Sequence, residues 1–331
     1  MKYIAETAWH HEGDFGYQKD LVSALCESDT VDIVKLHVTI DFDSYMDKTH
    51  PNYSMQKKWL LTESQWVDVV NIVDSSSKGL MLLVNDKKAI DFATNYNVDL
   101  IELHSVLLNV FTMQEIINQK IDTLTKVAIG VGGSSIEEID AAIDSYPHHE
   151  KILFFGIQNY PTVKENINLN KIKKIQDIYK KLDFAYADHS SWDDPDNIFI
   201  TSSIGTHGFS YIEKHITLNK GIKRCDFDSA ISLEDFKKIK QNIDKIELAF
   251  GDGKFELNQG EKKYREKGLM KLAPIYSKNM KAGDLLDRGS IDFIRTAKKT
   301  NIEQLQIFDF FGRKLKRDVI YNEPINYEDF E

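Results

Sequence analysis

The stretch Phe-Ala-Tyr-Ala-Asp-His-Ser-Ser, residues 184–191, decides the fold together with Tyr-Ile-Glu-Lys-His-Ile-Thr-Leu, residues 211–218. Each begins as a short strand-like run, and each run ends on a histidine, His189 or His215. If the two runs are neighbouring parallel strands, their ends lie about 4.8 Å apart, and the two imidazoles can meet over one divalent ion. The alternative is that each histidine caps or hydrogen-bonds its own loop.

The rest of the chain up to residue 250 repeats one unit, a short apolar segment followed by an amphipathic one. This alternation is typical of parallel βα units, and eight repeats predict an α/β fold, a (βα)8 TIM barrel over residues 1–250. The predicted strands are Tyr3–Thr7, Asp32–Val38, Met81–Val84, Leu100–His104, Val127–Val131, Ile152–Gly156, Phe184–Ala187 and Tyr211–His215.

Polar capping signals mark several expected helix starts. They are Thr62-x-x-Gln65, Ser135-x-x-Glu138 and Ser232-x-x-Asp235. The last barrel helix is expected to end near Gly251, since glycine is a common helix cap. Its apolar face carries Phe236, Ile239, Ile243 and Ile246.

The alternation stops after residue 250. Residues 251–267 are rich in Gly, Lys and Glu, and they are expected to form a polar linker. Short segments around 271–275 and 291–295 follow, with a polar end, so residues 268–331 are expected to form a small, mostly β domain.

Bulk properties exclude several classes of protein. The net charge of −10 argues against a nucleic-acid surface and makes an anionic substrate depend on local cations. Two cysteines, Cys26 and Cys225, give no disulfide framework. The sequence has no signal-peptide pattern and no run of 18 apolar residues, so we expect a cytoplasmic protein with no membrane partner.

The motifs resemble those of the sialic acid (N-acetylneuraminate) synthase family. The two histidine segments agree with that family in order, spacing and residue type. Further matching motifs are Ile-Ala-Glu (4–6), His-Glu-Gly (11–13), Val-Asp-Ile-Val-Lys (31–35), Asn-Tyr-Pro-Thr (159–162) and an aspartate at 228 followed by Ser-Leu-Glu (232–234). Lys-Ala-Gly-Asp (281–284), Asp-Phe-Ile-Arg (292–295) and Phe-Gly-Arg (311–313) are similar to the antifreeze-protein-like (SAF) domain that closes these synthases.

The resemblance implies a reaction and a site. The family joins phosphoenolpyruvate to the aldehyde of an open-chain N-acetylated sugar, and two histidines, here His189 and His215, hold one divalent metal per chain. The sequence does not choose among Mn²⁺, Fe²⁺, Co²⁺, Zn²⁺ and Mg²⁺. The residues that correspond to sugar contacts are Glu6, Tyr160 and either Asp226 or Asp228, of which we favour Asp228 from its spacing to Ser232.

The resemblance also implies an assembly. Arg295 corresponds to an arginine that the family's C-terminal domain presents to the barrel of the partner subunit. We therefore expect a homodimer with exchanged domains, in which Arg295 of one chain approaches Tyr160 and Asp228 of the other. The alternative is a C-terminal domain that folds back on its own barrel.

Several positions depart from the family pattern at the phosphoenolpyruvate end. A lysine on the fourth strand is Glu102 here, and a glutamate just beyond is Leu107. Two family serines are Gly130 and Ala187, and an asparagine is Gln158, whereas Lys35 and Ser105 remain. A bound phosphate would then need other cations, for which we consider Lys35, Lys87, Lys126 or the amides of residues 130–134.

A new polar cluster is expected where these departures fall. Side chains alternate along a strand, so Glu102 shares a face with His104, and Lys35 shares one with His37. If both faces point inward, Glu102, His104 and His37 form either a remodelled acid–base or metal site, or a hydrogen-bonded trio without chemistry.

We interpret the chain as a metal-dependent enzyme that forms a carbon–carbon bond between phosphoenolpyruvate, or a related donor, and an open-chain amino sugar. One alternative is a lyase or isomerase acting on a sugar, and another is a sugar-binding protein without catalysis. The candidate catalytic residues are Glu6, Lys35, Glu102, His104 and His37. The candidate substrate-binding residues are Tyr160, Gln158, Ser105, Asp226, Asp228 and Arg295.

Overall fold

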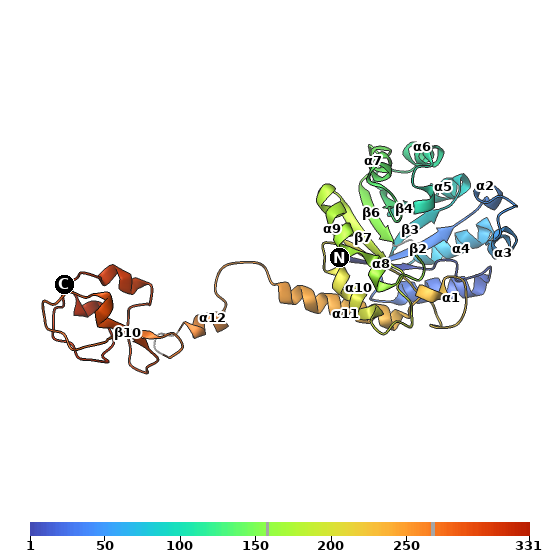
Figure 1. Ribbon diagram of the computed structural model, residues 1–331. Helices are drawn as coiled ribbons and strands as arrows, with labels where there is room; N and C mark the ends of the chain where they lie inside the picture. The colour runs from blue at the N-terminus through green and yellow to red at the C-terminus, as the bar shows by residue number, and fades with distance from the viewer. Residues whose placement is uncertain (157–158, 266–268) are drawn as a thin grey trace. The chain divides into compact units, whose positions relative to one another are not determined.

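The computed structural model describes residues 1–156, 159–265 and 269–331. The chain divides into two compact units, Met1–Gly251 and Asp252–Glu331, and each is described separately. The first unit is a closed barrel of eight strands with helices around it (Figure 1).

The barrel strands follow one another in chain order and all pair in parallel, β1 next to β2 and β8 closing onto β1. The prediction of a (βα)8 barrel is confirmed, and each predicted strand lies within two residues of an observed one. The strands are β1 (Lys2–Glu6), β2 (Ile33–Val38), β3 (Gly79–Val84), β4 (Leu100–Leu103), β5 (Lys126–Gly130), β6 (Lys151–Gly156), β7 (Asp183–Asp188) and β8 (Tyr211–His215).

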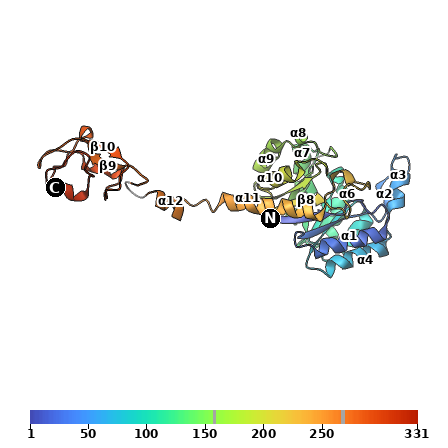
Figure 2. The ribbon, with the colours of Figure 1, turned by 90° about the horizontal axis from the view of Figure 1, so that it is seen from below.

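Helices cover the outside of the barrel, as two views at right angles show (Figure 2). The longer ones are α1 (Phe15–Glu27), α4 (Glu63–Asp74), α5 (Lys87–Ala93), α6 (Phe111–Lys120), α7 (Ile136–Asp144), α9 (Leu169–Ile178), α10 (Asn197–Gly205) and α11 (Leu233–Phe250). Single-turn helices lie in the loops, at α2 (Phe42–Tyr45), α3 (Tyr53–Gln56) and α8 (Lys164–Ile167).

Local sequence signals fix where these helices begin. Complete capping boxes, in which each partner's side chain accepts the other's backbone N–H, start α4 and α7. The Ser232 side chain accepts the backbone N–H of Asp235 at the start of α11, as expected. That helix ends at Phe250, where Gly251 has a positive φ of 64° that glycine adopts at little cost.

Alternation along the strands divides the barrel residues between two apolar layers. Side chains that point outward pack under the helices, where Phe236, Ile239 and Ile243 of α11 are buried. Side chains that point inward fill the lower part of the barrel, in a cluster of Ile4, Ile33, Met81, Leu100, Ala128, Ile152, Phe154, Ala185 and Tyr211. The lower part of the barrel is therefore a packed core, and in this fold active sites form at the carboxyl ends of the strands.

The strand register brings polar residues together at this end. Glu6 of β1 pairs with Lys35 of β2 on one side and with His215 of β8 on the other. Glu6 and Lys35 follow the inward-pointing Ile4 and Ile33 by two positions, and His215 follows Tyr211 by four, so all three also point inward. The first inward polar layer thus sits directly on the apolar core.

The C-terminal unit has its own small core and antiparallel pairing, which agrees with the expected small β region. Strand β9 (Ala273–Tyr276) pairs with β10 (Ile291–Ile294). Its core residues are Tyr276, Met280, Leu286, Ile302, Ile307, Phe310, Leu315, Val319, Ile325 and Phe330. The expected polar linker also contains a helix that we did not predict, α12 (Gln259–Tyr264), which an Asn258–Glu261 capping box begins. The identification of residues 268–331 as an antifreeze-protein-like domain stays a prediction.

Over the described residues, no helix combines the length and the apolar composition needed to cross a bilayer.

A buried ion pair joins the last two strands of the barrel. Lys214 Nζ lies 2.5 Å from Asp188 Oδ1, and both side chains are fully buried. Tyr186 and Ser190 donate further hydrogen bonds to the same carboxylate. This pair lies on the outer face of β7 and β8, opposite the two histidines.

We predict that Asp188→Ala destabilises the barrel by about 3 kcal/mol or more, because the Lys214 ammonium would remain buried without its counter-ion. Urea unfolding followed by tryptophan fluorescence measures this, since all four tryptophans lie in the first unit. Asp43→Ala is the control, because the Asp43–Lys57 pair is exposed and its loss should leave the midpoint unchanged. Equal midpoints for Asp188→Ala and wild type would contradict the prediction.

Candidate active site

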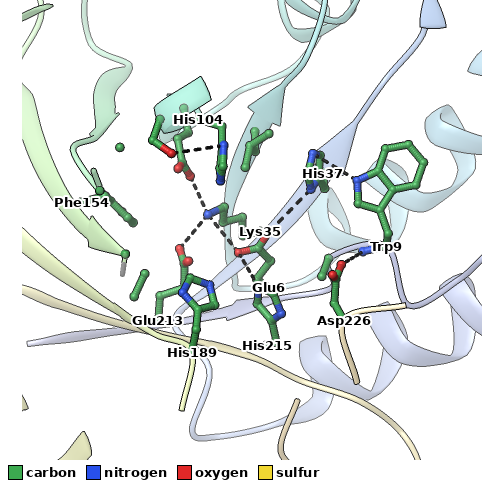
Figure 3. A pocket seen from close by; sticks show the side chains of 18 of the residues that line it. Glu6, Trp9, Lys35, His37, His104, Phe154, His189, Glu213, His215 and Asp226 are labelled. Atoms are coloured by element: carbon green, nitrogen blue, oxygen red, sulfur yellow. Dashed lines mark hydrogen bonds and ion pairs between the residues drawn. The ribbon is translucent and has the colours of Figure 1, made fainter. Parts of the chain in front are cut away.

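A cavity of about 330 Å³ opens at the carboxyl ends of the strands, lined by residues from all eight of them. Figure 3 shows that the side chains of Glu6 and Glu213 point toward Lys35. The remaining walls of the cavity are small or apolar. They are Ala8, Leu83, Gly130, Gly132, Phe154, Gly156 and Ala187.

Three carboxylates surround the ammonium group of Lys35. Lys35 Nζ lies 2.6 Å from Glu102 Oε2, 3.0 Å from Glu6 Oε2 and 3.0 Å from Glu213 Oε2. Each of the four side chains is at most 5% exposed. We call these four residues the lysine cage. The contact with Glu213 is a hydrogen bond, and the contacts with Glu6 and Glu102 are ion pairs.

The cage sets the protonation of its members. Burial alone would lower the pKa of Lys35, but the carboxylates, with Glu102 foremost, raise it well above its ordinary value. Burial alone would likewise raise the pKa of Glu6, but Lys35 and His215 hold it well below its usual range. Burial raises the pKa of Glu213, helped by the neighbouring Glu6 and Glu102 carboxylates. Lys35 therefore stays charged, and it does not act as an amine nucleophile.

His189 and His215 lie side by side at the ends of β7 and β8, with ring centroids 4.9 Å apart (Figure 3). Glu6 Oε2 lies 3.5 Å from His215 Nε2, and Ser229 Oγ lies 3.3 Å from His215 Nδ1. Burial, together with the neighbouring His215, lowers the pKa of His189 to about 3. His189 is therefore a neutral imidazole at physiological pH, the form that binds metal ions.

The histidine pair fits a divalent ion. Within the described residues, the Nδ1 atom of His189 is buried and has no hydrogen-bond partner. An orphaned nitrogen of this kind is costly unless a ligand satisfies it. In the part of the chain that the structure describes, no three His, Cys, Asp or Glu side chains are grouped so that they could hold a metal. An ion bound here would thus have two imidazole ligands and open positions for other ligands.

A second histidine site lies on the other side of Glu6. Trp9 Nε1 donates a hydrogen bond to His37 Nε2 at 3.3 Å, and Asn85 Nδ2 lies 2.8 Å from the same nitrogen. An indole N–H can only donate, so Nε2 of His37 is the bare nitrogen. Burial lowers the pKa of His37 to about 4. The neutral ring therefore carries its proton on Nδ1, which lies 4.0 Å from Glu6 Oε1.

Sequence comparison matches residues 32–255 to the model of the NeuB family. This match covers more than half of the chain. The chain belongs to the NeuB family.

Named relatives extend over nearly the whole chain. An uncharacterized protein of Methanocaldococcus jannaschii is 26% identical, over 98% of this chain and 93% of that protein. The N,N'-diacetyllegionaminic acid synthase of Legionella pneumophila is 23% identical, over 99% of this chain and 94% of that protein. A crystal structure of an N-acetylneuraminic acid (sialic acid) synthetase from Leptospira borgpetersenii has a TM-score of 0.70 at 18% identity. It covers 79% of this chain and 88% of that one. The resemblance to the sialic acid synthase family is thereby confirmed, and the solved structure agrees with the barrel fold.

Most of the expected site residues of this NeuB-family chain line the one cavity. They are Glu6, Lys35, His37, Glu102, His104, Ser105, Tyr160, His189, His215 and Asp226. The expected trio of Glu102, His104 and His37 shares the cavity, but each makes its own contacts: Glu102 to Lys35, and His37 to Trp9 and Asn85. The side chain of His104 instead accepts the backbone N–H of Val106. The roles of all these residues stay predictions.

Asp226 lines the cavity, whereas the favoured Asp228 does not, within the described residues. Asp226 has a left-handed backbone with φ of 61°, and its carbonyl accepts a hydrogen bond from the Tyr160 hydroxyl. The spacing from His215 favours Asp226, whereas the spacing to Ser232, on which we relied, favours Asp228. Gln158 lies outside the described residues, and Arg295 is exposed in the C-terminal unit.

The cations proposed for a phosphate are not in the cavity, apart from Lys35. Lys126 lies at the start of β5, the opposite end of the barrel, and pairs with Glu150 at 2.6 Å. Lys87 begins α5 and does not line the cavity either. Lys87 and Lys126 are therefore not placed to bind a phosphate in this cavity. Gly130 and Gly132 do line it, so the expectation for the amides of residues 130–134 stays a prediction.

Sequence reasoning missed Glu213 as a site residue. It lies two residues before His215, so the alternation of a strand places both on the inner face, and this signal was available. Trp9, Asn85 and Ser229 were also missed, because loops bring them in and no periodic pattern marks them. The same is true of Tyr45 and Gln56, which reach the cavity from the short helices α2 and α3.

We predict that Trp9→Phe allows the His37 proton to occupy either ring nitrogen. Phenylalanine keeps an aromatic ring at this position but has no N–H to donate to His37 Nε2. Nitrogen-15 NMR of the imidazoles at neutral pH should show a bare Nε2 for His37 in the wild type and a partly protonated Nε2 in Trp9→Phe. Trp192→Phe, outside the cavity, is the control and should keep the wild-type spectrum. A wild-type His37 that carries its proton on Nε2 would contradict the assignment.

Proposed function

We propose that this chain is a sugar-acid synthase that joins a three-carbon donor, phosphoenolpyruvate or a related compound, to the aldehyde of an open-chain N-acetylated amino sugar. The observation that carries the proposal is the His189–His215 pair beside Glu6, at the carboxyl ends of adjacent barrel strands. The relative named above as an N,N'-diacetyllegionaminic acid synthase supports the same reaction class.

The geometry suggests how the chain's own residues serve such an acceptor. A divalent ion bound by His189 and His215 would act as a Lewis acid on the aldehyde oxygen. The Nδ1–H of His37 and the carboxylate of Glu6 face each other across 4.0 Å, so together they offer one donor and one acceptor to sugar hydroxyls. The Tyr160 hydroxyl is held by the Asp226 carbonyl and by Ser229, which places its ring beside both histidines.

The test is a product assay on the purified, metal-loaded full chain. N-acetylmannosamine and related open-chain amino sugars are supplied with phosphoenolpyruvate or with pyruvate, and mass spectrometry detects a sugar acid three carbons longer than the acceptor. We expect such a product with at least one donor, and its loss in Glu6→Gln. No product with any acceptor and donor would contradict the proposed function.

We further predict that the purified chain binds about one divalent ion through His189 and His215. Replacing both histidines with alanine removes both imidazole ligands, so bound metal measured by plasma mass spectrometry should fall to background. The control is His148→Ala with His207→Ala, two histidines that do not line the cavity. Unchanged metal content in the His189, His215 double variant would exclude this site.

We also propose a homodimer in which the C-terminal unit of one chain covers the cavity of the other, with Arg295 reaching the partner's site. The support is the resemblance of this unit to a lid domain. A two-fold dimer of this kind gives two equivalent sites, and each combines residues from both chains. The lid would exclude water from the reacting aldehyde.

This assembly predicts complementation between two inactive variants. In a mixed dimer of Arg295→Ala and His189→Ala chains, one site carries both defects and the other carries none. Activity should therefore recover to about half per mixed dimer. Mixed samples that stay inactive, or a monomer in solution scattering, would contradict the exchanged dimer.

A further inference from the structure

The charges that line the cavity are unbalanced. Lys35 is the single cationic side chain among the described residues that line it, whereas Glu6, Glu102, Glu213 and Asp226 all carry carboxyl groups. The ammonium group of Lys35 already lies 2.6 to 3.0 Å from three carboxyl groups inside the lysine cage. No cationic side chain of the described cavity is therefore left free to receive a phosphate.

The described walls around the cage carry no second cationic side chain. Ser105 and His104 are the polar residues there. Gly130, Gly132 and Phe154 have no side-chain donor, and the Phe154 ring lies 5.7 Å from Lys35 Nζ. A side chain at position 130 would bring its Cβ to 2.9 Å from the backbone nitrogen of Ser105, so a hydroxyl residue does not fit there without moving the chain. Over the described residues, this end of the cavity therefore offers a phosphate no cationic side chain other than Lys35.

The orientation of Glu102 suggests a role of its own. One carboxylate oxygen, Oε2, is held by Lys35 at 2.6 Å. The other, Oε1, faces the space above Gly130, where it lies 3.5 Å from the position that a Cβ would take. Glu102 is thus a fixed carboxylate at an open, small-walled part of the cavity, where it can repel a phosphate or accept a proton.

We propose that the donor is a small 2-oxo acid without a phosphate group, of which pyruvate is the simplest, and that the carbon–carbon bond forms by aldol addition. This inference rests on the proposed function. Glu102 accepts a proton from the donor carbon next to the carbonyl group, and that carbon bonds to the aldehyde carbon. The aldehyde oxygen takes up one proton, so the product is the sum of donor and acceptor, with no phosphate released and no water consumed.

The first test is calorimetric titration of the metal-loaded full chain with phosphoenolpyruvate and with pyruvate. Wild type should show no saturation by phosphoenolpyruvate in the millimolar range. Glu102→Gln removes one negative charge at nearly constant shape, so it should tighten phosphoenolpyruvate binding at least tenfold. Glu115→Gln makes the same charge change on the exposed face of α6 and should have no effect. Micromolar binding of phosphoenolpyruvate by wild type would overturn the inference.

The second test follows the products. With pyruvate and the amino-sugar acceptors, wild type should form the sugar acid, and phosphoenolpyruvate should release no phosphate. Sugar acid formed from phosphoenolpyruvate with phosphate release would overturn the inference while supporting the proposed function. No sugar acid from either donor would overturn the proposed function, and the inference with it. Thermal unfolding and metal content of each variant confirm that Glu102→Gln remains folded.

Discussion

The ammonium group of Lys35 lies inside the barrel, where three carboxylates take the place of water around it. Removing a charged group from water costs several kcal/mol unless partners of good geometry replace the solvent. Here the partners come from three other strands, β1, β4 and β8. The cage therefore depends on barrel closure, because it requires β8 to pair with β1 in the observed register.

The same register shapes the rest of the site. Glu6 stands between Lys35 and His215, so one carboxylate links the lysine cage to the histidine pair. Its other oxygen faces His37, whose tautomer Trp9 fixes. A change in any of these side chains alters the charge felt by its neighbours, because they lie at short distances in a mostly buried site that screens charge poorly. The lysine cage, the histidine pair and His37 are thus coupled through Glu6.

The barrel could be predicted because its signals are local. Apolar strand segments, capping boxes such as Thr62–Gln65 and the cap at Gly251 each act within a few residues. The inward-facing polar residues also followed from the alternation of strands, although Glu213 was overlooked. What the sequence did not supply was pairing across the barrel. The distance between Glu102 and Lys35, and the choice of Asp226 over Asp228, depend on register and on loop conformations that carry no periodic signal. The lysine cage itself was therefore found only in three dimensions.

The central claim is that Lys35 is committed to its three carboxylates and is not available to a phosphate. A crystal structure of the metal-loaded protein soaked with phosphoenolpyruvate tests this most directly. The account predicts metal density between His189 and His215, an intact cage with Glu102 at salt-bridge distance from Lys35, and no phosphate density beside them. Ordered phosphoenolpyruvate with its phosphate on Lys35, and Glu102 turned away, would contradict it.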